Sequence, residues 1–165
     1  MLSESFALNR KEFEQIFTYD ESVFVLWDSD NNGRNIQSNF AVGLVDCIEF
    51  ICGLTIFSNC RVEDKIRFLF EFFDMNDNNY LEECDLQFMF LSTINAVAKL
   101  FAFTNEAEKE AVFNFMCKFT LQSFPEGMKV TISEMLKWGT TALEFKEFFT
   151  LVELYNQKNP QQVLT

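Results

Sequence analysis

Twelve residues in the middle of the chain carry oxygen atoms at the spacing that a divalent cation needs. Oxygen-bearing side chains stand at the first, third, fifth, ninth and twelfth places of residues 74–85, and a backbone carbonyl is available at the seventh. In such a loop, a tight turn wraps six or more oxygens around one hard cation, typically calcium. The candidate ligands are Asp74, Asn76, Asn78, Tyr80 through its carbonyl, Glu82 and Asp85.

The residues on both sides of this loop predict helices. Apolar side chains recur before and after it at intervals of three and four residues: Ile66, Leu69, Phe70 and Phe73, then Leu86, Met89 and Phe90. That interval places them on one face of a helix. Leu81, at the eighth place, stands where two paired loops share a short ribbon. The alternative, a solvated turn rich in Asn and Asp, explains neither Leu81 nor the two stripes.

A helix, an oxygen-rich loop and a second helix resemble the EF-hand of calcium-binding proteins. Two places depart from the family pattern, since the sixth holds Asn79 instead of Gly and the twelfth holds Asp85 instead of Glu. Asn is the next most tolerant residue of a positive φ. Because Asp is one methylene shorter than Glu, we expect Asp85 to ligate through one oxygen, which weakens calcium binding. The resemblance implies a Ca²⁺ site, with Mg²⁺ as an alternative ion at rest.

A second loop begins upstream and is interrupted. Its first, third and fifth places hold Asp28, Asp30 and Asn32, and its eighth, ninth and twelfth places reappear after an insertion within residues 34–44. Loops tolerate insertions because closure entropy grows slowly with length, but Glu49 at the twelfth place has to return to the cation. Two interpretations stay open. Either Asp28, Asp30, Asn32 and Glu49 bind a second ion, or this hand survives only to pair with a neighbour.

Two further segments resemble halves of the same unit but lack ligands. Residues 8–13 resemble the back half of a loop with its exit helix, and residues 130–135 have the same shape. The resemblance is closest to neuronal-calcium-sensor-like and calaxin-like proteins. It implies an all-α fold of four EF-hand-like units in two pairs, mostly degenerate, with short two-stranded ribbons between the loops. The expected organisation is an N-terminal pair over 1–60, a C-terminal pair over 61–155 and a loose polar tail over 156–165.

The composition disfavours several classes of function. The formal net charge of −12 argues against nucleic acid and anionic membranes as partners, and favours a basic or amphipathic protein segment. With 22 Phe in 165 residues the chain can bury a core. The apolar stretch 44–57 contains two carboxylates and is too short to span a bilayer, so we expect no membrane insertion.

The complete lack of histidine argues against catalysis. It removes Ser-His-Asp, Cys-His and most acid–base arrangements, and no phosphate-binding Gly-rich loop is present. Five cysteines without a Cys-x-x-Cys pair are typical of reduced thiols in the cytoplasm. We therefore expect a cytoplasmic protein that is not an enzyme. The calaxin-like resemblance adds the ciliary axoneme as a setting, with the dynein-docking machinery as one candidate assembly.

Two functions fit these features. In the first, a freely diffusing sensor binds calcium and opens an apolar groove for a partner helix. The candidate groove residues are Phe68, Phe72 and Phe88, which lie off the core stripes; their alternative place is the core between the two pairs. In the second, the chain is a permanent regulatory or structural subunit of a larger assembly, in the axoneme or, as in calcineurin-B-like proteins, on an enzyme.

Overall fold

The fold is mostly helical, with two small antiparallel sheets of two strands each. The computed structural model describes residues 7–16, 24, 25, 27, 28, 43–100 and 127–158. In chain order the elements are β1 (Ala7–Asn9), α1 (Arg10–Ile16), β2 (Leu44–Asp46), α3 (Cys47–Phe57), α4 (Val62–Phe73), β3 (Tyr80–Leu81), α5 (Glu83–Leu100), β4 (Val130–Thr131), α7 (Ile132–Thr141) and α8 (Leu143–Lys158). The predicted helical class and the two-stranded ribbons are confirmed at this level.

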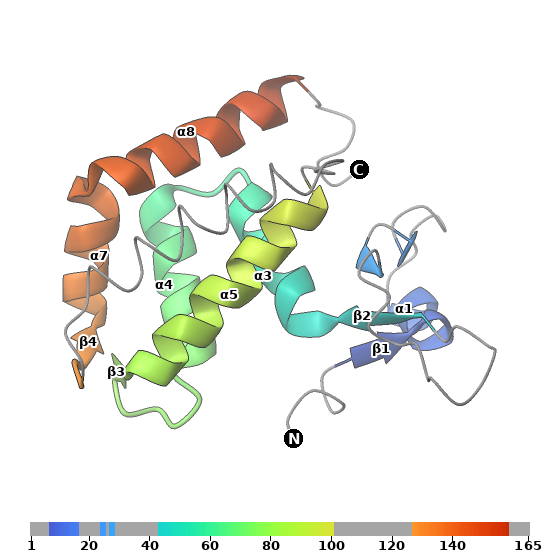
Figure 1. Cartoon of the computed structure of the whole chain (residues 1–165), viewed down its shortest axis with the longest axis horizontal. Helices are drawn as coiled ribbons and strands as arrows, with labels where there is room; N and C mark the ends of the chain where they lie inside the picture. Colours follow the sequence, from blue (N-terminus) through green and yellow to red (C-terminus); the bar gives the residue numbers. More distant parts are fainter. Residues whose placement is uncertain (1–6, 17–23, 26, 29–42, 101–126, 159–165) are drawn as a thin grey trace.

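The first ribbon joins segments that are far apart in the sequence. β1 and β2 pair with Leu8 opposite Val45, and each strand runs directly into a helix. Phe13 of α1 packs edge-to-face on Phe24 and Phe50, with ring centroids 5.6 and 5.3 Å apart. This ribbon and α1 form one end of the molecule, and the other helices gather at the opposite end (Figure 1).

The second ribbon ties the middle of the chain to its C-terminal part. β3 and β4 pair with Leu81 opposite Val130 and Tyr80 opposite Thr131. β3 lies between α4 and α5, while β4 leads into α7, which packs against α4. Residues 74–85 therefore follow α4 directly and run into α5. Within them, Tyr80 and Leu81 are fixed by pairing with β4.

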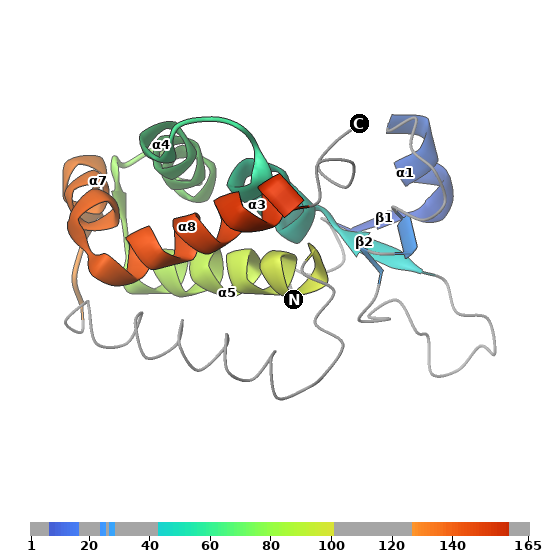
Figure 2. The ribbon, with the colours of Figure 1, turned by 90° about the horizontal axis from the view of Figure 1, so that it is seen from above.

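The predicted apolar stripes of α4 and α5 form the centre of the core. All seven side chains are buried: Ile66, Leu69, Phe70, Phe73, Leu86, Met89 and Phe90. α3 packs against α5 and also contacts α4 and α8, so elements on both sides of residue 60 share one interface. α8 runs across this group from α7 towards α3 (Figure 2). It ends at Lys158, so the first three residues of the predicted tail 156–165 are helical.

Candidate cation loop and the residues around it

The oxygen-rich run is a compact turn between two helices. α4 ends at Phe73, and the carbonyl of Asp74 accepts a hydrogen bond from the N–H of Asp77 at 3.1 Å. Asp77 and Asn79 have φ of 53° and 65°, in the left-handed region. Asn and Asp are the non-glycine residues that adopt this region at least cost, which is why Asn79 can stand at the sixth place.

The first three candidate ligands turn their oxygens towards the inside of the loop. The carboxylate of Asp74 accepts from the N–H groups of Asn78 and Asn79, at 3.1 and 2.9 Å. The side-chain oxygen of Asn76 accepts from the same Asn78 N–H at 3.2 Å, and that of Asn78 accepts from the Tyr80 N–H at 3.0 Å. Asp74 and Asn76 thus share the Asn78 N–H, and the Asn78 side chain binds the next donor along the loop, the Tyr80 N–H.

The last two candidate ligands have other protein partners. Oδ2 of Asp85 accepts from the Glu82 N–H at 3.0 Å, as a side chain in the first turn of a helix often does. Oε1 of Glu82 lies 3.5 Å from the ammonium of Lys129, which also donates to the Tyr80 hydroxyl at 2.8 Å. These contacts raise the pKa of Lys129, the hydrogen bond to Tyr80 most of all.

The donor set of the loop suits a hard cation in its chemistry. Calcium and magnesium take oxygen ligands, and this loop offers carboxylates, amide oxygens and one backbone carbonyl. Among the residues that the structure describes, no three Asp, Glu, Cys or His side chains gather as a ready metal site. Neutral amide oxygens would therefore supply part of the coordination, and an ion would compete with Lys129 for Glu82.

A hydrogen-bonding pattern recurs where helices begin. Glu12 accepts from the Asn9 N–H at 2.9 Å, and Glu134 accepts from the Thr131 N–H at 2.9 Å. Asp85 makes the same contact with the residue three places before it. The N–H and hydroxyl of Thr131 lower the pKa of Glu134. Glu12, Asp85 and Glu134 thus stabilise the starts of three helices.

In the upstream loop, the predicted ligand Asp28 forms a hydrogen bond with a residue much later in the loop. Oδ1 of Asp28 accepts from the Leu44 N–H at 3.1 Å. A Cβ at Gly43 would lie 2.4 Å from Oδ2 of Asp28, so any other residue here would require the Asp28 side chain to move. The structure thereby joins residue 28 to residues 43 and 44. Two other predicted ligands, Asp30 and Asn32, lie outside the described residues.

The fourth upstream candidate, Glu49, is a buried partner of α5. Its Oε2 lies 2.6 Å from the ammonium of Lys99, and its Oε1 accepts from the Asn95 amide at 2.7 Å. Burial raises the pKa of Glu49, an effect that Lys99 and Asn95 only partly offset. Oε1 of Glu49 is therefore hydrogen-bonded to Asn95, and Oε2 forms a buried ion pair with Lys99.

The three predicted groove residues lie on one apolar surface of α4 and α5. Phe68 stacks on Phe72, with ring centroids 6.1 Å apart. Phe73 links them to Phe88 through edge-to-face contacts at 5.2 and 5.5 Å. Phe68 and Phe88 remain 47% and 43% exposed, so neither is part of the core. We call Phe68, Phe72 and Phe88 the phenylalanine surface.

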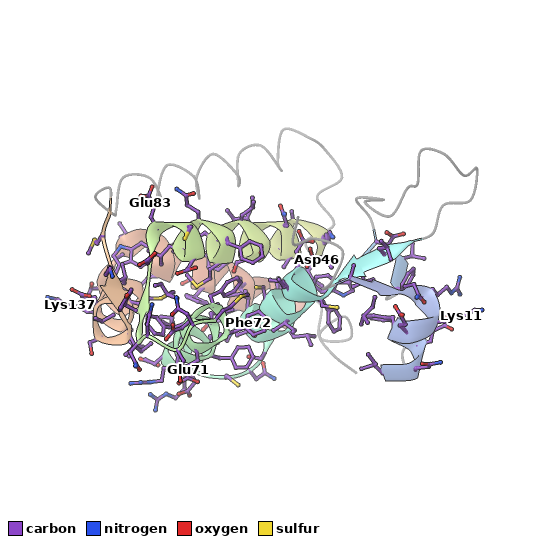
Figure 3. The ribbon with its side chains drawn as sticks, turned by 90° about the horizontal axis from the view of Figure 1, so that it is seen from below. Lys11, Asp46, Glu71, Phe72, Glu83 and Lys137 are labelled. Carbon is purple, nitrogen blue, oxygen red and sulfur yellow. The ribbon has the colours of Figure 1, made fainter. Side chains whose placement is uncertain are left out.

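Three functional candidates were not predicted from the sequence: Asn95, Lys99 and Lys129. Asn95 and Lys99 are polar residues four apart in residues 94–100 of α5, which are otherwise apolar, and this is a signal that they share a partner. Lys129 precedes Val130, and its contact with Glu82 follows from the register of the second ribbon. Figure 3 shows Asp46 where β2 runs into α3, and Glu83 where α5 begins. Because α3 packs on α5, the helix α5 connects the two loop regions.

Within the described part of the chain, no helix has both the length and the apolar character needed to cross a membrane. No protein-family model matches this sequence.

Proposed function

We propose that this chain is an EF-hand-like protein that binds one divalent cation at residues 74–85 and serves as a regulatory or structural subunit of a partner protein. The observation that carries the proposal is the position of Asp74, whose carboxylate gathers the loop backbone inside a helix–turn–helix. The pairing of Leu81 with Val130 supports it, because loops of this kind occur in pairs joined by a short ribbon.

Calcium is the ion we propose, with magnesium as the competitor at rest. Asp85 supplies a short carboxylate at the twelfth place, and its Oδ2 already accepts the Glu82 N–H. Calcium takes six to eight oxygens in flexible geometry, whereas magnesium needs six in a near-ideal octahedron. Lengthening this side chain in Asp85→Glu should therefore raise calcium affinity more than magnesium affinity.

The experiment is a calorimetric titration of the full chain with CaCl₂ and with MgCl₂. Wild-type protein should bind one calcium ion, and Asp74→Ala should weaken binding by about tenfold or more, because it removes a charged ligand. Glu71→Ala is the matched control, since Glu71 is an exposed carboxylate of α4 just outside the loop. If Asp74→Ala and Glu71→Ala bind calcium as wild type does, the ion does not bind in this loop.

We further propose that the phenylalanine surface contacts the partner, which presents a basic or amphipathic helix. Exposed apolar rings and a net charge of −12 support such a partner, since the acidic field attracts basic segments. The double variant Phe68→Ser/Phe88→Ser should lose binding of a synthetic basic amphipathic helix. Leu143→Ser, at an exposed position where α8 begins, should bind this helix normally. Equal loss in both variants would argue against this surface.

The same titration distinguishes a sensor from a permanent subunit. A hydrophobic dye that binds the phenylalanine surface only after calcium addition would identify a sensor, including a freely diffusing one. Dye binding that is equal with and without calcium would identify a permanently exposed docking surface. For the cellular setting we propose the cytoplasm, and within it the axonemal dynein-docking machinery or a calcineurin-B-like role on an enzyme. The sequence resemblance alone supports these settings.

A further inference from the structure

Buried charged side chains gather around the helix α3. Among the residues that the structure describes, three charged side chains are buried: Glu49, Lys65 and Lys99. Glu49 belongs to α3, and the two lysines reach α3 from neighbouring helices, Lys99 from α5 and Lys65 from α4. A buried charge loses its hydration, so the convergence of all three on one helix needs a physical reason.

Lys99 contacts the first turn of α3. Its ammonium lies 2.6 Å from Oε2 of Glu49, and Asn95, one turn earlier in α5, donates to Oε1 at 2.7 Å. The same ammonium donates to the backbone carbonyl of Trp27 at 3.0 Å. Both oxygens of the Glu49 carboxylate therefore contact side chains of α5. These contacts fix the rotation of α3 and its position along α5 at this end.

Lys65 contacts the last turn of the same helix. Its ammonium donates to the backbone carbonyl of Ile56 at 2.6 Å and lies 5.7 Å from the ring centroid of Phe149 in α8. The last carbonyls of a helix have no partner within it, and the helix dipole favours a cation there. A buried ammonium thus lies at each end of α3, and the two come from different helices.

Apolar packing by itself gives α3 little preference for one orientation. Glu49 is its only charged residue, and residues 48–50 are all buried, so α3 buries side chains on more than one face. Hydrophobic burial has no direction. A shift of α3 by one helical turn, about 5.4 Å, could bury similar apolar area but would separate Glu49 from Lys99. Burial raises the pKa of Glu49 and lowers that of Lys65, so it disfavours both charged forms.

We propose that the ammonium groups of Lys99 and Lys65 select one position of α3 among several that apolar packing allows. The proposal goes beyond the function proposed above and does not depend on cation binding. A displaced α3 would leave buried charges without partners, which costs more than the ion pair contributes in its native position. The two lysines therefore specify the arrangement of α3, α4 and α5 more than they stabilise it. Because α3 continues directly from β2, its position also determines where the first ribbon lies.

The test replaces the ion pair by apolar side chains in the full chain. Lys99→Met alone leaves the Glu49 carboxylate buried without its counter-ion, and the thermal unfolding midpoint should fall by about 10 °C. Adding Glu49→Leu should restore about half of this loss or more, because no unpaired charge remains. In a proton–nitrogen correlation spectrum of this double variant, the amide signals of α3 should be doubled or broadened, because α3 then occupies more than one position.

Arg10→Met/Glu14→Leu is the matched control, since it removes an ion pair whose side chains are both about half exposed. It should keep one set of amide signals and shift the midpoint by less than about 2 °C. A single sharp set of α3 signals in Glu49→Leu/Lys99→Met would overturn the proposal, because packing alone would then specify the position. A double variant that does not fold, or that is no more stable than Lys99→Met, would also overturn it, since the pair would then act through stability.

The other end of α3 is tested with Lys65→Met, which keeps an apolar chain and removes the donor to Ile56. Amide hydrogen exchange at residues 54–57 should become about tenfold faster, with little change at residues 48–50. Lys65→Arg keeps a charged donor and should show the exchange rates of wild type. No change in exchange, or equal acceleration at both ends of α3, would overturn the positioning role of Lys65.

Discussion

Leu81 and Val130 lie opposite each other in the second ribbon, and both side chains are completely buried. This contact joins the end of the candidate cation loop to the strand that leads into α7. Because α7 packs on α4, the end of the loop is anchored both to its own helices and to a helix from the C-terminal part of the chain. The stability of the loop and that of the C-terminal helices are therefore linked.

Truncating Leu81, one of the two buried members of this pair, should destabilise the whole chain. Leu81→Ala removes a fully buried side chain, and we expect the free energy of unfolding to fall by about 3 kcal/mol. Urea unfolding followed by circular dichroism measures this. Leu91→Ala makes the same chemical change at an exposed position of α5 and should cost less than about 0.5 kcal/mol. Similar losses in both variants would mean that Leu81 has no special role.

The positive φ of Asn79 should determine which substitutions the loop accepts. Asn79→Ala should be about 1 kcal/mol less stable than Asn79→Gly, because alanine at φ 65° is strained and glycine is not. The order should reverse at Met75, a neighbouring exposed loop residue that is not among those with positive φ. Urea unfolding of the four variants checks this. If alanine were preferred at position 79, the loop would have another backbone conformation in solution.

Lys129 should weaken cation binding at the candidate loop. Its ammonium lies 3.5 Å from the Glu82 carboxylate, so an incoming cation meets a like charge and loses part of a ligand. Lys129→Met should therefore raise calcium affinity by about threefold at low salt, and by less at high salt. Lys137→Met, at an exposed lysine of α7, is the control for net charge (Figure 3). Equal gains in calcium affinity in both variants would mean that Lys129 acts only through the net charge of the protein.

The buried carboxylate of Glu49 should affect stability in a pH-dependent way. Burial raises its pKa above the ordinary value of 4.5, so the folded state binds the proton more tightly than the unfolded state. Its contribution to stability is fully present below 4.5 and is lost as the pH rises through the folded-state pKa. The free energy of unfolding of wild type relative to Glu49→Gln should therefore decrease as the pH rises above 4.5.

Glu134 is the matched control for this pH dependence, with the opposite sign. The Thr131 hydrogen bonds lower its pKa, so its contribution is present above 4.5 and is lost as the pH falls through the folded-state value. Wild type relative to Glu134→Gln should become less stable at acid pH. If the difference for Glu49 had the same sign as for Glu134, Lys99 would outweigh burial at Glu49.

The sequence predicted the helices around the loop because the information is local. Ile66, Leu69, Phe70 and Phe73 repeat with the period of a helix, and this period alone places them on the core face. The two ribbons were also predictable, since Leu8, Val45, Leu81 and Val130 are apolar residues at matching places of each segment. That α3 packs on α5 was not predictable, because apolar stripes specify a buried face but not the helix that covers it.

The candidate site was likewise only partly predictable from the sequence. The types and spacing of Asp74, Asn76 and Asn78 by themselves determined a turn whose side-chain oxygens bind the loop backbone, because these contacts span only a few residues. Only the tertiary structure decided that Glu49 pairs with Lys99 and that Glu82 faces Lys129. Those partners come from distant parts of the chain, and helix packing and strand register bring the opposite charges within reach.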